Sequence, residues 1–284
     1  MRYARATFRF FALCGITAGY YLRWLTGAPF VFATNSRARD WRNRNFCGWA
    51  RTSVRVMGLS INVRNQPPTG PFLMVSNHLS YVDIIVLGSQ ANCAFVAKSE
   101  VARWPIIGLI CRTMDTIFID RNLRKDIPGV MQRIEETMRR GLGVVLFAEG
   151  TSTNGQCVLP FKTSLLEFAA RNLLAVHYAS VGYVVPSGEP SADRSVCWWG
   201  DTTFPGHLFR LLQLPSFEAS LIYGSKPIVA GDRRVLAAKL WSAVSSQLSS
   251  SPKARGPQRR SADVVEEGGQ LGDPGLTKEL ELSP

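Results

Sequence analysis

The sequence predicts an α/β protein in which a mixed sheet is flanked by helices and preceded by an N-terminal membrane-binding helical motif. Short apolar runs typical of strands alternate along the chain with helical segments, the pattern of a sheet covered on both faces. Three of these runs end at polar clusters, and ligands of such sheets bind beyond the carboxyl ends of the strands. The remaining observation is an N-terminus that is both apolar and rich in arginine.

The individual elements follow from periodicity and from the residues that start or stop a helix. Asn35 or Ser36 can cap the first helix after the apolar N-terminus, and Gly58 stops it. Strict alternation of apolar residues begins directly afterwards and predicts a strand. Strands are expected over residues 59–63, 72–75, 94–97, 116–119, 144–147, 175–185, 195–199 and 218–223. Helices are expected over residues 35–57, 81–88, 101–112, 127–140, 161–172, 204–213 and 232–248.

Composition narrows the class of protein. The chain has 284 residues, of which 46% are hydrophobic and 19% charged, and this excludes a disordered chain, a collagen-like repeat and a small disulfide scaffold. The six cysteines lie far apart and there are three histidines, so no metal site is expected and the cysteines should be reduced. We expect a helical motif over 1–57, a globular domain over 58–249 and a disordered tail over 250–284.

The basic charge is concentrated at the N-terminus. The chain carries a formal net charge of +12, and residues 1–70 hold eleven arginines and one acid, Asp40. Arginine beside an apolar stretch favours an anionic membrane surface as partner. Nucleic acid is the competing partner, but no fold signature of a nucleic-acid-binding protein accompanies the charge, and the aromatic residues lie inside the apolar run. We therefore expect a membrane surface and no nucleic acid.

The apolar stretch over residues 10–33 would be roughly 36 Å long as a helix, enough to span a bilayer. Arg23 lies near its middle, however, and Gly27 and Pro29 interrupt its second half. Arginines flank both ends, and basic flanks favour the cytoplasmic side. An in-plane or re-entrant pair of helices satisfies these features better than a single span, which stays the alternative, followed by a soluble core helix.

The first polar cluster is Asn77-His78-Leu79-Ser80-Tyr81-Val82-Asp83, after the strand at 72–75. Positions five apart lie about 140° apart around one helix, so His78 and Asp83 can meet if His78 sits in the turn before the helix. Asp83 would then accept the ring N–H and leave the other nitrogen as a base. A histidine merely packed in a turn is the alternative interpretation.

The second and third clusters also follow apolar strands. Arg121, after Asp120, could form a surface ion pair or grip a phosphate or carboxylate in bidentate fashion. In the third cluster, Glu149 is followed by Gly150, which permits close backbone approach. The side chains that could bind phosphate oxygens there are Thr151, Ser152 and Lys162, although the cluster is not a P-loop.

Taken in order, these clusters resemble the three signature blocks of the glycerolipid acyltransferases, and most closely those of bacterial 1-acyl-sn-glycerol-3-phosphate acyltransferases. The blocks are His78-x4-Asp83, the segment 118–121 and the segment 147–151, and the resemblance covers roughly residues 60–225. It implies an α/β sheet with an N-terminal membrane-binding helical motif, and makes residues 58–249 the catalytic domain. It also implies an enzyme at the cytoplasmic face of a bacterial inner membrane, monotopic or with a single span.

By this resemblance the protein moves an acyl chain from acyl-CoA or acyl carrier protein to the hydroxyl of lysophosphatidic acid, without a cofactor, and gives phosphatidic acid. His78 would be the general base and Asp83 would orient it. The acceptor-binding residues implied are Arg121, Glu149, Gly150, Thr151 and, as the basic residue after the third block, Lys162.

Departures from the family pattern leave the identity of the acceptor lipid undecided at this point. Ser152 stands where arginine is common, which weakens the case for a phosphate-bearing acceptor. The segment 198–212 resembles the branch that includes lyso-ornithine lipid acyltransferases, so acylation of a lyso-ornithine lipid or another lysolipid is the alternative. A non-catalytic basic binder of membranes or nucleic acid is the alternative from another class of protein.

Overall fold

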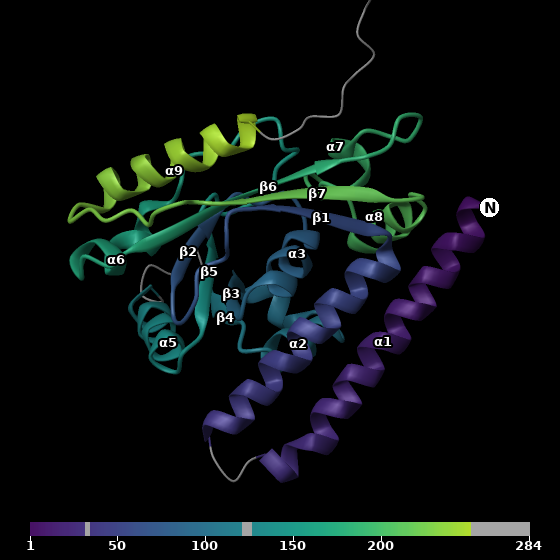
Figure 1. The fold of residues 1–284 in the computed structure, drawn as a ribbon, viewed down its shortest axis with the longest axis horizontal. Coiled ribbons are helices and arrows are strands. Elements are labelled where there is room, and N and C mark those ends of the chain that lie inside the picture. The colour runs from purple at the N-terminus through teal and green to yellow at the C-terminus, as the bar shows by residue number, and fades with distance from the viewer. Residues whose placement is uncertain (32–34, 121–126, 251–284) are drawn as a thin grey trace, which may run out of the picture. The chain divides into compact units, whose positions relative to one another are not determined.

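The computed structural model describes residues 1–31, 35–120 and 127–250. Within them the strands form one seven-stranded sheet in the order β1-β7-β6-β2-β5-β3-β4 (Figure 1). Neighbouring strands are parallel except for the antiparallel pair of β6 and β7, so the predicted mixed sheet is confirmed. The strands are β1 (Leu59–Arg64), β2 (Leu73–Ser76), β3 (Cys93–Lys98), β4 (Ile117–Ile119), β5 (Gly143–Phe147), β6 (Val176–Val184) and β7 (Phe217–Tyr223).

Helices cover both faces of the sheet, because the central strands are apolar on both sides. In β5, Val145 and Phe147 face one hydrophobic core, whereas Val144 and Leu146 face the other. The α-helices are α1 (Arg2–Val31), α2 (Asn35–Met57), α3 (Val82–Gln90), α4 (Ile107–Thr113), α5 (Ile127–Arg139), α6 (Glu167–Arg171), α7 (Ala192–Ser195), α8 (Phe204–Leu212) and α9 (Arg233–Ser250). The 3-10 helices are η1 (Ser99–Arg103) and η3 (Thr163–Leu166).

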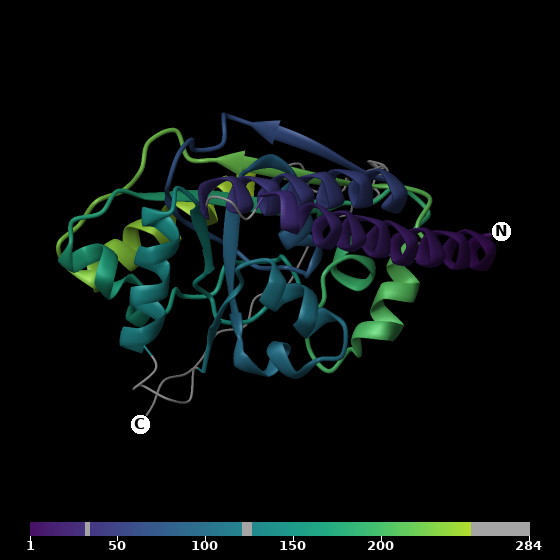
Figure 2. The same ribbon diagram turned by 90° about the horizontal axis from the view of Figure 1, so that it is seen from below.

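The first two helices run side by side and form a hairpin against the rest of the molecule, whereas α9 covers the opposite face of the sheet (Figures 1 and 2). Helix α1 packs against α2 and α8, and α2 packs against α3. Among the described residues, no helix is both long and apolar enough to cross a membrane.

Arginines of the N-terminal hairpin bind groups within the protein. Arg9 donates to the backbone oxygens of Leu214 at 2.6 Å and Pro215 at 3.0 Å, just beyond the C-terminus of α8. Arg5 donates to the backbone oxygen of Gln213 in the same turn. The guanidinium of Arg23 lies 4.9 Å from the centre of the Trp41 ring. Part of the basic charge that we assigned to a membrane partner therefore holds the hairpin in place.

Three predicted elements differ from the observed ones. The strand expected over 195–199 is wrong: the segment begins in α7, where the N–H of Val196 bonds to the oxygen of Ala192. A short apolar run does not distinguish a buried strand from a buried turn. The helix expected over 101–112 is interrupted after η1, because Pro105 pushes Trp104 into extended backbone. The helix expected over 161–172 begins later and is divided between η3 and α6, because Lys162 is extended.

The predicted domain limits, 1–57, 58–249 and 250–284, stay predictions. Residues 251–284, which make up almost all of the expected disordered tail, lie outside the described residues. Arg121 of the second cluster also lies outside them, and so do the side chains of Asn35 and Ser36, the expected helix caps.

Candidate active site

The His78–Asp83 pair lies at the carboxyl end of β2, a strand between β6 and β5 in the middle of the sheet. The chain turns after Ser76, so His78 lies in the turn and Asp83 in the first turn of α3. His78 Nδ1 and Asp83 Oδ2 are 2.8 Å apart. The structure thus brings these two side chains together in the arrangement that the spacing predicts.

The Asp83 carboxylate is fully buried and accepts hydrogen bonds from four groups. Its Oδ2 accepts the backbone N–H groups of Leu79 at 2.7 Å and Ser80 at 3.0 Å, in addition to the His78 ring. Its Oδ1 accepts the hydroxyl of Tyr183 at 2.6 Å. With four donors around it, Asp83 is held as an acceptor, so the His78 nitrogen that faces it carries the proton.

Phe147, the last residue of β5, covers one face of the His78 ring. The imidazole stacks on Phe147 with 4.1 Å between the ring centres and 18° between the planes. This contact fixes one face of the ring, while the His78 side chain keeps 20% of its surface exposed. The ring can therefore present its Nε2 to a substrate without leaving its place on Asp83.

Glu149, which the family resemblance places among the acceptor-binding residues, is buried behind His78. Its Oε1 accepts the backbone N–H of His78 at 2.7 Å, and its Oε2 accepts that of Leu159 at 2.7 Å. Burial raises the pKa of Glu149 to about 7, although both backbone N–H bonds act in the opposite direction. In this structure Glu149 fastens the third cluster to the turn that carries His78.

The other predicted acceptor-binding residues do not all lie beside the His78–Asp83 pair. Gly150 adopts a φ of 83°, a left-handed conformation that glycine allows, directly after the buried Glu149. Thr151 and Lys162 are both exposed, and the backbone N–H of Lys162 bonds to the oxygen of Ala148 at 2.8 Å. The second cluster follows β4, which β3 separates from β5 in the sheet. The acceptor-binding roles of these residues stay predictions.

The sequence did not predict the contacts that β6 makes with the His78–Asp83 pair and its turn. The Asn77 side chain donates to the backbone oxygen of Val181 and accepts the Val181 N–H, both at 2.8 Å. Tyr183 follows two positions later on the same face of the strand. The polar residue directly before His78 was the available signal for the first contact, whereas no local pattern points to Tyr183.

An aromatic wall lies beside the His78 turn and is built from Tyr81, Trp104, Trp198 and Phe204, whose rings contact one another. The backbone N–H of Trp198 bonds to the oxygen of Leu79 at 2.8 Å, which ties the wall to the turn. The Ser152 hydroxyl donates to the Trp198 backbone oxygen. The segment that resembles the lyso-ornithine lipid branch therefore borders the candidate site.

His207 supports this wall from behind. Its Nε2 lies 3.0 Å from the backbone oxygen of Cys197, and its Nδ1 lies 3.1 Å from the Tyr81 hydroxyl. Burial lowers the pKa of His207 to about 4, so the ring is neutral at physiological pH: it donates to Cys197 and accepts from Tyr81. His207 therefore links the Tyr81 side chain to the backbone of Cys197 beside the site.

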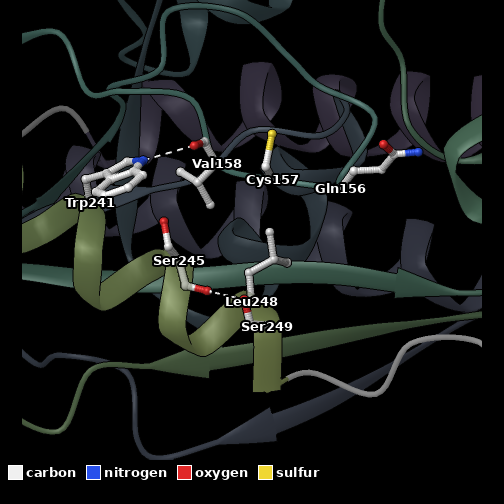
Figure 3. Close-up of a pocket in the computed structure, with 7 residues that line it drawn as sticks. All are labelled: Gln156, Cys157, Val158, Trp241, Ser245, Leu248 and Ser249. Atoms are coloured by element: carbon white, nitrogen blue, oxygen red, sulfur yellow. Dashed lines mark hydrogen bonds between the residues drawn. The ribbon is translucent and has the colours of Figure 1, made fainter. Parts of the chain in front are cut away.

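A separate pocket lies at α9 and the loop that follows the third cluster (Figure 3). Trp241 of α9 donates to the backbone oxygen of Val158 at 2.9 Å at its edge. Its lining contains none of the predicted site residues and consists of Gln156, Cys157, Val158, Trp241, Ser245, Leu248 and Ser249.

Comparison with known proteins agrees with the fold and with the family that the sequence resembles. The family model described as acyltransferase matches residues 60–187. A lyso-ornithine lipid O-acyltransferase of Rhodobacter capsulatus is 35% identical over 205 residues, which are 69% of this chain and 72% of that protein. A 1-acyl-sn-glycerol-3-phosphate acyltransferase of Neisseria gonorrhoeae is 29% identical, over 61% of this chain and 68% of that protein.

Among solved structures, the 1-acyl-sn-glycerophosphate acyltransferase PlsC of Thermotoga maritima has the same fold, with a TM-score of 0.66 and 18% identity. The match covers 88% of this chain and 97% of that one. The α/β fold is the one that this solved acyltransferase has. The chain belongs to this acyltransferase family, which confirms the resemblance that its three clusters predict.

Proposed function

We propose that this enzyme transfers a fatty acyl group from an acyl thioester to the free hydroxyl of a lysolipid, with His78 as general base and Asp83 as the residue that orients it. The observation that carries the proposal is the 2.8 Å contact between His78 Nδ1 and the buried Asp83. It fixes the tautomer in which Nε2 has a free lone pair. A base of this kind must lie within hydrogen-bond reach of the hydroxyl that it deprotonates.

The reaction needs no covalent intermediate on the protein. His78 Nε2 takes the proton of the lysolipid hydroxyl as its oxygen attacks the thioester carbonyl. The tetrahedral intermediate then collapses, the carbon–sulfur bond breaks, and the imidazolium returns the proton to the leaving thiolate. Asp83 stabilises the transient imidazolium, because its carboxylate faces the other ring nitrogen. The donor in this proposal is acyl-CoA or acyl carrier protein, and no cofactor takes part.

The acceptor that we favour is a lyso-ornithine lipid. Where arginine is common in the family, Ser152 places a hydroxyl that binds the Trp198 backbone, so this position offers no cation to a phosphate. The relative named for lyso-ornithine lipid is 35% identical over 205 residues, against 29% over 175 for the relative named for the glycerol phosphate acceptor. The sequence alone favours lysophosphatidic acid, which stays the second candidate because three signature blocks are shared with that branch.

The proposal extends to a membrane surface at the cytoplasmic face of a bacterial inner membrane. Residues spaced three or four apart lie on the same face of a helix, and one such face of α1 carries exposed apolar side chains. Among them are Phe8, Phe11, Leu22 and Leu25, with exposed fractions of 72%, 66%, 61% and 47%. A surface of this kind suits insertion into the interface of a bilayer. Exposed arginines of the hairpin would add attraction to anionic lipids.

A wild-type acceptor panel tests the proposed function. The purified full chain is supplied with acyl-CoA or with acylated acyl carrier protein, and with each lysolipid at equal concentration. We expect kcat/KM to be at least about tenfold higher for the lyso-ornithine lipid, the ratio that 1.4 kcal/mol of selective binding would give. The reverse preference would establish the glycerol phosphate acceptor, and no transfer to either would overturn the proposal.

The same assay includes His78→Ala, which should lower kcat by about 10² or more with either acceptor. The matched control is His177→Ala, because His177 is a half-buried histidine of β6 that packs against Phe72, at 6.2 Å between ring centres. The control should stay within a few-fold of wild type. A folded His78→Ala protein with nearly full activity would contradict the assignment of the base.

A further inference from the structure

We propose that Tyr183 is a positioning residue of the acyltransferase site, which holds Asp83 so that Asp83 can hold His78. The inference rests on the proposed role of His78 and adds a third member to the pair. Tyr183 lies on β6, one hundred residues from Asp83 in the sequence, and its hydroxyl donates to Asp83 Oδ1 at 2.6 Å. This is the short distance of an O–H bond to a charged oxygen.

The two carboxylate oxygens of Asp83 have different partners. Oδ2 is shared by the His78 ring and the N–H groups of Leu79 and Ser80. Within the described residues, the hydrogen bond to Oδ1 comes from the Tyr183 hydroxyl. Asp83 is fully buried and Tyr183 is 8% exposed, so water does not readily replace that hydroxyl. Without it a buried carboxylate oxygen is left unpaired, which is costly and frees the carboxylate to rotate.

The pairing of β6 with β2 positions Tyr183 beside Asp83. Strand β6 pairs in parallel with β2 from Val176 opposite Leu73 to Ala179 opposite Ser76, where β2 ends. The Asn77 side chain continues the pairing by two hydrogen bonds to the backbone of Val181. Since side chains alternate along a strand, Ala179, Val181 and Tyr183 share the face that meets α3, and the third of them reaches Asp83.

The groups around the pair explain why this hydroxyl affects catalysis and not stability alone. Ionisable side chains that act electrostatically on Asp83 or Tyr183 are His78, Glu149, Tyr81 and Cys197. None of these is a cation apart from His78 when it is protonated. Asp83 therefore shares its negative charge between the Tyr183 hydroxyl and the His78 ring. A loss of the hydroxyl shifts that balance toward the ring and alters the angle at which Nε2 meets the acceptor.

The test compares Tyr183→Phe with Tyr223→Phe. Tyr223 is a matched control, because it is 1% exposed, lies on neighbouring β7, and has a hydroxyl without a hydrogen bond in the described part of the chain. For Tyr183→Phe we expect kcat to fall about 5- to 50-fold, since part of one charged hydrogen bond is lost. The acceptor KM should change less than about twofold, because Tyr183 does not touch the acceptor. Tyr223→Phe should leave both constants near wild type.

The acid limb of the kcat/KM profile separates positioning from a packing role. Without the tyrosine hydroxyl, Asp83 holds the imidazolium form more strongly, so the limb should move to higher pH in Tyr183→Phe and stay in Tyr223→Phe. Incorporation of 3,5-difluorotyrosine at position 183 keeps the shape and strengthens the donor. It should move the limb to lower pH, and it provides the measurement if Tyr183→Phe fails to fold.

A double-mutant cycle shows whether Tyr183 acts through Asp83. In an Asp83→Asn background, Tyr183→Phe should reduce kcat by less than about twofold further. Equal losses in both backgrounds, or a Tyr183→Phe protein that behaves like Tyr223→Phe, would overturn the inference. Those outcomes differ from failure of the proposed function, in which wild type transfers no acyl group to either lysolipid or His78→Ala keeps its activity.

Discussion

Glu149 is the buried acid whose protonation the environment changes most clearly. Burial raises its pKa from the usual 4.5 to about 7, so between these values the folded protein still binds a proton that the unfolded chain has released. Stability contributed by this group is therefore full below about pH 4.5 and is lost as the pH rises toward 7. At about 1.4 kcal/mol for each pH unit, the loss is on the order of 3 kcal/mol.

Urea unfolding of wild type and Glu149→Gln across this pH range measures that contribution. We expect the free energy of unfolding of wild type to fall with pH relative to the variant, because glutamine cannot ionise. The absolute stability of Glu149→Gln will differ as well, since its amide meets two backbone N–H groups, but the difference in slope is the decisive quantity. Parallel pH profiles for the two proteins would show that Glu149 does not titrate in this range.

The docking of α1 depends on a helix terminus, not on apolar packing alone. Arg9 bonds to the backbone oxygens of Leu214 and Pro215 beyond α8, where helix carbonyls lack partners and the helix dipole favours a cation. Arg9→Ala should lower the free energy of unfolding by about 1–2 kcal/mol, as expected for hydrogen bonds from a charged group with partial exposure.

The control for Arg9→Ala is Arg2→Ala on the same helix. The Arg2 side chain is 56% exposed and forms a 3.3 Å ion pair with Glu189, the kind of surface pair that contributes little. It should change stability by less than about 0.5 kcal/mol. Urea unfolding at fixed pH measures both variants, and equal effects would contradict the capping role of Arg9.

At the scale of the whole molecule, the exposed apolar surface of α1 predicts which face binds a membrane. Phe8 and Phe11 on α1 have exposed fractions of 72% and 66%. Replacing both by serine should weaken binding to phosphatidylglycerol vesicles by at least about tenfold, since a buried phenylalanine contributes about 1.5–3 kcal/mol. Co-sedimentation of the full chain with the vesicles measures the change.

The matched control replaces two exposed valines elsewhere by serine. Val229 and Val235 each have an exposed fraction of 47%, and Val235 lies on α9, which covers the other face of the sheet (Figure 1). This variant should bind vesicles within about twofold of wild type. If both pairs of substitutions weaken binding equally, or neither does, α1 is not the membrane-binding face.

The sequence by itself determined the alternation of strands and helices, the family and the pairing of His78 with Asp83. The elements and the His78–Asp83 pairing are local, because each depends on spacing within one helix, strand or turn. The family rests on the order of three such local clusters along the chain. The same local view failed for residues 195–199, because an apolar run does not specify its own conformation. The local view also assigned the charges of Arg5 and Arg9 to a membrane partner. In the structure these side chains donate to backbone oxygens at the C-terminal end of α8, about two hundred residues away in the chain.

Only the tertiary structure decided which groups surround the pair. Tyr183 reaches Asp83 because β6 pairs with β2 in one register, and a shift by one residue would turn its side chain to the other face of the sheet. Glu149 meets the backbone of His78 because β5 and β2 are neighbours that end at the same edge. Strand order and register depend on the packing of the whole core, and for that reason no local spacing in the sequence reveals these contacts.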